Sequence, residues 1–200
     1  MLSRFKGRPP GMVAVCYSLM LAFLLVACGG GTTSAPTPTP TPRPSPTPAL
    51  TVYRGNGFSI DYPKDWTVTP GDHNVTFKGE GGLYTFIAGA IPNPGGSIDA
   101  NAFASKAIER AKTQVKNPQT VPLPSTTTVG GDSWVQKSIT GTETSTGQGL
   151  ALQLVVLSDN HPAHATNTQI FTIVYDTEKS LFPTANTSYF QPMLQSFKFT

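Results

Sequence analysis

Apolar residues recur at every third or fourth position from about residue 100 to residue 116, and this spacing predicts one long amphipathic helix. Asp99 stands where an N-cap residue would accept a backbone hydrogen bond. Asn117-Pro118 is expected to end the helix, because proline cannot continue it. The apolar stripe consists of Ala100, Phe103, Ala104, Ala107, Ile108, Ala111 and Val115. We expect this helix to cover one face of a sheet.

Several short runs have the pattern of β-strands. Residues 57–62 alternate apolar and polar side chains up to Pro63, which is typical of a half-buried strand. Residues 83–91, 150–157 and 170–175 are apolar at nearly every position, so we expect those strands to be covered on both faces. The sequence therefore predicts an α/β (α+β) domain over residues 51–200, with a mainly antiparallel sheet sandwiched by helices.

A second helix is predicted near the end of the chain. Phe190, Met193, Leu194 and Phe197 would share one face of it. Pro192 is tolerated only in the first turn of a helix, so this helix is expected to start late or to be kinked.

Residues 1–27 have the pattern of a secretory signal: three basic residues, then an apolar run that is short for a membrane span. Leu25-Val26-Ala27 before Cys28 resembles a bacterial lipobox, which implies cleavage after Ala27 and a lipid on the Cys28 sulfur. The alternative is an uncleaved membrane anchor. Both interpretations predict a protein tethered to the cell membrane on its extracytoplasmic face.

Residues 28–50 form a Thr/Pro-rich linker after the lipidated cysteine. Proline occupies every second position from Pro36 to Pro48, so an extended rod of roughly 40 Å is expected over these thirteen residues. A spacer is the simpler interpretation, and a ligand for a proline-recognition module is the alternative. The threonines of the linker could also carry sugars.

Charge and cysteine content exclude several classes of function. From Thr51 onward ten Lys and Arg face eleven Asp and Glu, a net charge of −1, so we expect no nucleic-acid binding. Both cysteines, Cys16 and Cys28, precede the domain. The domain therefore has no disulfide and no thiolate nucleophile.

Two segments carry a family resemblance. Residues 57–68, GFSIDYPKDWTV, look like the opening of the PsbP-like family, relatives of a photosystem II extrinsic protein that include many bacterial lipoproteins. Residues 189–199, YFQPMLQSFKF, are similar to the closing helix and last strand of that family. The resemblance implies an antiparallel sheet between helices over residues 50–200. It does not imply an activity, because both segments form core.

Candidate chemistry is sparse. Asp159, His161 and His164 form a cluster that resembles metal ligands, but three or four converging ligands are needed, and histidines in a loop are more often solvated. No Gly-x-Ser-x-Gly nucleophile elbow occurs, and Gly130-Gly131-Asp132 reads as a hairpin turn. We therefore predict no catalytic residue, no metal and no cofactor.

The function predicted from the sequence is non-catalytic: the domain binds, or helps assemble, another surface or membrane protein. The alternative is a small-ligand receptor or an enzyme that uses a pocket between sheet and helix. A deep cavity that gathers polar side chains would favour the alternative. A shallow apolar patch would favour protein binding.

Overall fold

The computed structural model describes residues 48–144 and 149–200. The predicted signal at 1–27, the lipidation site Cys28 and the linker up to residue 47 lie outside the described residues. The described residues belong to one compact unit, Pro44–Thr200. Both of its hydrophobic clusters lie inside this unit, so it carries its own core.

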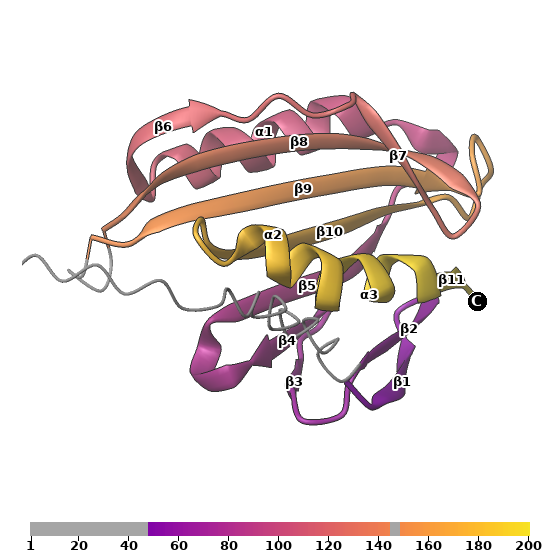
Figure 1. The fold of residues 1–200 in the computed structure, drawn as a ribbon. Coiled ribbons are helices and arrows are strands. Elements are labelled where there is room, and N and C mark those ends of the chain that lie inside the picture. Colours follow the sequence, from indigo (N-terminus) through magenta and orange to yellow (C-terminus); the bar gives the residue numbers. More distant parts are fainter. Residues whose placement is uncertain (1–47, 145–148) are drawn as a thin grey trace, which may run out of the picture. The chain divides into compact units, whose positions relative to one another are not determined.

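Two antiparallel sheets form the domain (Figure 1). The large sheet has eight strands. Seven of them follow the order β3-β4-β5-β10-β9-β8-β6, and the eighth, β7, pairs with β8. Its strands are β3 Thr67–Pro70, β4 Asn74–Gly79, β5 Tyr84–Pro92, β6 Val115–Thr120, β7 Thr126–Val129, β8 Asp132–Glu143, β9 Ala151–His161 and β10 Gln169–Glu178. The small sheet is β1 Leu50–Gly55, β2 Phe58–Pro63 and β11 Lys198–Phe199, in the order β1-β2-β11. Two short turns of helix complete the domain: η1 Glu80–Gly82 lies between β4 and β5, and η2 Pro94–Gly96 lies between β5 and α1 Ala100–Lys112.

Helix α1, Ala100–Lys112, packs on one face of the large sheet over β8 and β9. Its buried residues Ala104 and Ile108 form a cluster with Ile139 and Val156 from those strands. Asp99 is the N-cap as predicted, since its Oδ1 accepts a hydrogen bond of 2.8 Å from the backbone N–H of Ala102.

The predicted extension of this helix to residue 116 is wrong. The helix ends at Lys112, where Thr113 donates its hydroxyl to the carbonyl of Arg110 at 2.7 Å. Val115 already belongs to β6, where it pairs with Glu143 of β8. Asn117 does not stop a helix. It has a φ of +50° and lies in the irregular stretch of β6, where the pairing register shifts.

The opposite face of the large sheet is covered by the C-terminal helical segment. This segment runs through α2 Phe182–Ala185, the π-helical turn η3 Asn186–Phe190 and α3 Gln191–Ser196. Pro192 lies in the first turn of α3, as its chemistry requires. The four predicted core residues, Phe190, Met193, Leu194 and Phe197, are all buried.

The main core lies between these helices, the large sheet and the small sheet. Aromatic contacts join the three layers: Phe86 of β5 lies 6.3 Å from Phe190, and Phe58 of β2 lies 5.2 Å from Phe197, measured between ring centroids. The predicted fold class, a mainly antiparallel sheet between helices, is confirmed. None of the helices in the described residues combines the length and hydropathy needed to cross a membrane.

Candidate functional site

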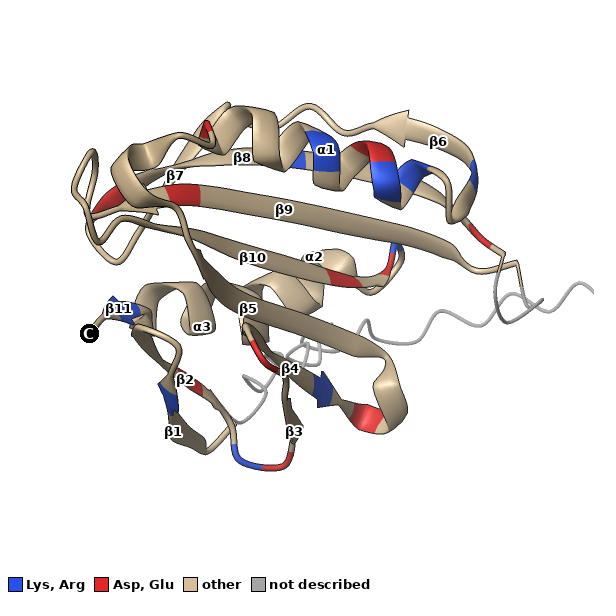
Figure 2. Cartoon of the chain, turned by 180° about the vertical axis from the view of Figure 1, so that it is seen from behind, with Lys and Arg blue, Asp and Glu red and all other residues tan. Residues whose placement is uncertain are grey.

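A groove runs beside α1 on the face of the large sheet that α1 covers only in part. Figure 2 shows α1 over β8 and β9, while β10 and β5 continue beside it without a covering helix. The prediction that residues 83–91 and 170–175 would be covered on both faces is therefore wrong for one face of β5 and of β10. Ile87 and Ile91 point to that face and are only half-buried.

Two hollows make up this groove, which we call the α1 groove. The first has a volume of about 230 Å³ and lies beside the first half of the helix; its lining includes Ile87, Ile91, Phe103, Thr172 and Val174. The second has a volume of about 490 Å³ and lies at the C-terminal end of the helix; its lining includes Ala111, Val115, Ile139, Leu152, Leu154 and Asp176. Val174 and Asp176 are two positions apart on β10, so the hollows follow one another along that strand.

Strand alternation explains why the floor of the groove is apolar. Phe86 and Ala88 of β5 point into the main core, so Ile87 points to the other face. Ile87 pairs directly with Val174 across the β5–β10 ladder. The result is an apolar floor that α1 flanks but does not cover.

Asp176 is the one strongly perturbed carboxylate of the groove in the part of the chain that the structure describes. Burial raises its pKa from 3.8 to about 6, while the positive charge of Lys78 and a hydrogen bond from Thr85 act in the opposite direction. Thr85 is its partner in the β5–β10 pairing. The larger hollow therefore contains a carboxyl group that loses its proton at a higher pH than an ordinary aspartate does.

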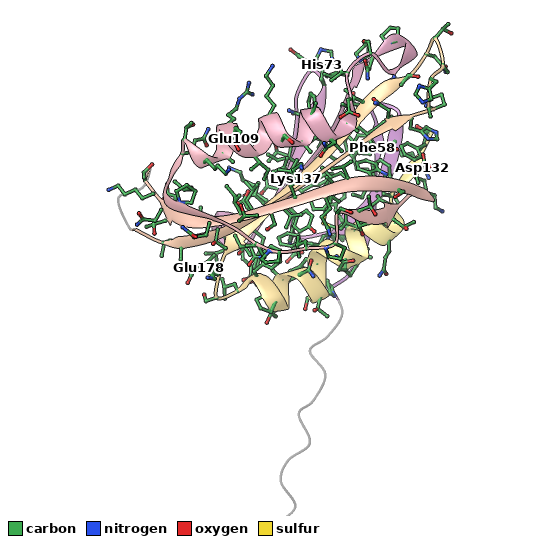
Figure 3. All side chains as sticks on the ribbon, turned by 90° about the horizontal axis from the view of Figure 1, so that it is seen from above. Phe58, His73, Glu109, Asp132, Lys137 and Glu178 are labelled. Carbon is green, nitrogen blue, oxygen red and sulfur yellow. The ribbon has the colours of Figure 1, made fainter. Side chains whose placement is uncertain are left out.

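A second group of polar side chains gathers at the end of the large sheet. Asp132, at the start of β8, and Asp159 and His161, at the end of β9, have potential ligand atoms within 4.8 Å of one another. We call these three residues the Asp–His cluster. Nδ1 of His161 lies 2.6 Å from Oδ2 of Asp132. Figure 3 shows Asp132 at one end of the domain and Glu178, the last residue of β10, at the other.

Packing and charge define the surroundings of this cluster. The His161 ring stacks on Phe199 of β11, with 3.6 Å between ring centroids and 4° between ring planes. Burial, and then the charge of Asp132, raise the pKa of Asp159. Oδ2 of Asp159 is buried and has no hydrogen-bond partner in the described residues.

The structure brings together two of the three candidate ligands from the sequence. His161 is not in a solvated loop, because it is the last residue of β9 and is partly buried. His164 lies outside the cluster, in the exposed turn after the cis His161-Pro162 bond, with its Nδ1 near Gly96. Asp132 was missed because it was interpreted as part of a turn. No local sequence signal points to it, because its position beside His161 comes from the pairing of β8 with β9.

No family model and no curated protein matches the chain. Solved structures of similar fold include LpqN of Mycobacterium tuberculosis, described as involved in cell envelope biogenesis, with 15% identity, a TM-score of 0.50, and 76% of this chain and 91% of LpqN covered. A Bacteroides thetaiotaomicron protein has 12% identity and a TM-score of 0.48 over 77% of this chain, which spans only 49% of that protein. The Ran-binding protein Mog1p of Saccharomyces cerevisiae has 8% identity and a TM-score of 0.46 over 76% of this chain and 96% of Mog1p.

Of these similarities, the one to LpqN supports the fold and carries no residue-level correspondence. The resemblance to the PsbP-like family stays a prediction, since no family model matches.

Proposed function

We propose that the chain is a membrane-tethered extracytoplasmic lipoprotein whose domain binds another surface or membrane protein through the α1 groove, without catalysis. The observation that carries this proposal is the uncovered apolar floor of the groove, formed by Ile87, Ile91 and Val174 beside Phe103. The anchor rests on the lipobox at Cys28, and we assign the domain to the PsbP-like family on its two core-forming segments.

An extended protein segment fits this groove for two reasons. Protein interfaces have an apolar centre and a polar rim. The groove has an apolar floor, and the outer surface of α1 beside it carries both signs of charge, with Lys106, Glu109 and Arg110 exposed (Figure 2). The hollows also follow β10, so an occupant would have to be elongated.

The fold similarity to LpqN is compatible with this proposal. LpqN is described as involved in cell envelope biogenesis. The cell envelope is also the compartment that the signal and Cys28 predict for this chain.

The test is site-specific photocross-linking of the full chain in cells. A photoreactive residue at Thr172, in the groove, should give a defined adduct with one envelope protein, and the same residue at the exposed Thr187 of η3 should not. Ile87→Glu should abolish the Thr172 adduct, because a charge on the apolar floor must be desolvated on binding. An equal adduct at Thr187, or a Thr172 adduct that persists in Ile87→Glu, would contradict the proposal.

The alternative is a small-ligand receptor or an enzyme, and the larger hollow with Asp176 favours it. Its volume of about 490 Å³ lies within the usual range for ligand sites, roughly 300–1,000 Å³. Native mass spectrometry of protein purified from its own cells separates the two. A bound small molecule that Asp176→Asn loses would favour the alternative.

A further inference from the structure

We propose that the Asp–His cluster binds a divalent transition-metal ion of the Zn²⁺ type. This site lies at the end of the large sheet and is independent of the α1 groove. It also departs from the sequence-based expectation, which took the histidines as solvated.

The donor set fits such an ion. Two carboxylates and one imidazole supply three potential ligand atoms within 4.8 Å of one another. Imidazole favours Zn²⁺ and its neighbours over Ca²⁺ and Mg²⁺, and carboxylate oxygen is an accepted Zn²⁺ ligand. Three protein ligands would leave one position of a tetrahedral ion open to water or to another molecule.

No Lys or Arg of the described residues forms a salt bridge with the cluster, and His161 is its one basic side chain. In residues 48–144 and 149–200, the salt bridges are Lys112–Glu109 and the Asp132–His161 contact itself. The buried Oδ2 of Asp159 has no hydrogen-bond partner there. A buried carboxylate oxygen without a partner is costly, and a cation would supply the missing partner.

The cluster is also held in place. Asp132 and His161 lie on neighbouring strands just beyond the last β8–β9 pair, Val135–Ser158, so their side chains continue the contact between the strands. Stacking on Phe199 fixes the plane of the His161 ring. Preorganised ligands reduce the entropy cost of binding an ion.

In the first test, Zn²⁺ is titrated into a protein of residues 44–200. Isothermal calorimetry measures the binding, and the metal content of the protein is determined separately. We expect one ion per domain, because the cluster offers one set of three ligand atoms. Asp159→Asn keeps the shape of the side chain and should weaken binding by at least about tenfold. His164→Gln, three residues beyond His161 and outside the cluster, is the matched control and should leave the affinity unchanged.

A second measurement needs no variant of the cluster. The chain has three histidines, His73, His161 and His164, whose imidazole proton resonances can be followed by NMR during the titration. The proposal expects His161 alone to shift. Absence of binding at about 100 µM Zn²⁺, a shift of His73 or His164 instead, or equal weakening by Asp159→Asn and His164→Gln would overturn it.

Discussion

Burial raises the pKa of Asp176 more than the charge of Lys78 and the hydrogen bond from Thr85 lower it. Its pKa of about 6 in the folded protein lies above the ordinary value of 3.8, so the folded state binds this proton more tightly than the unfolded state does. The contribution of this group to stability is therefore fully present below about pH 4 and is lost as the pH rises through 6.

Asp176→Asn should remove this pH dependence. Relative to wild type, the variant should gain stability at pH 7.5 on the order of 2 kcal/mol, and little at pH 4, because asparagine has no proton to lose. Urea unfolding at both pH values measures the effect, and Asp72→Asn, in an exposed turn, is the control. Identical pH slopes for wild type and Asp176→Asn would contradict the assignment.

Sequence reasoning at this scale identified residues that are close in the chain. Asp159 and His161 were found because they are two positions apart in the sequence, whereas Asp132 is 29 residues from His161. Its place depends on how β8 and β9 pair, which the residues around Asp132 do not specify. The burial of Asp176 likewise depends on how strands from different parts of the chain assemble.

At the scale of elements, α1 depends on the segment that precedes it. Asn93 is 1% exposed, and its amide makes four hydrogen bonds: it donates to the carbonyl of Ile98 and to Asn160, and accepts from Ser97 and from the N–H of Ile98. Asn160 also donates to the carbonyl of Ile98, at 2.9 Å. The start of α1 is therefore tied to the end of β9.

We expect Asn93→Ala to destabilise the domain by about 2–4 kcal/mol, because it removes a buried side chain that makes four hydrogen bonds. Asp99→Ala, which removes only the N-cap bond, should cost about 1 kcal/mol. Urea unfolding of the two variants compares them directly. Equal costs would show that the Asn93 network does not hold the helix.

The end of α1 shows why an apolar stripe predicts the existence of a helix better than its length. Val115 continues the helical period, yet β-branched residues favour strands, and pairing with β8 takes this residue into β6. The same limit applies to the groove. Alternation in β5 predicts which side chains share a face, but the area that α1 covers depends on where the helix lies on the sheet.

At the scale of the whole molecule, the cellular location predicted from the sequence depends on one residue, Cys28, which lies outside the described residues. We expect Cys28→Ser to abolish metabolic labelling with palmitate and to leave unprocessed precursor or released protein. A single acyl chain holds a protein only weakly, so stable attachment requires two or more chains on this residue. Equal labelling of wild type and variant would exclude lipidation at Cys28.

The central claim is that the α1 groove binds a protein, and the most direct measurement is the affinity of residues 44–200 for the partner captured at Thr172. Val52→Glu is the matched control, because Val52 is a 49%-exposed apolar residue of β1, outside the groove lining. We predict that Ile87→Glu raises Kd by at least about tenfold, equivalent to roughly 1.4 kcal/mol, and that Val52→Glu leaves it unchanged. An unchanged Kd for Ile87→Glu, or an equal loss in Val52→Glu, would contradict the account.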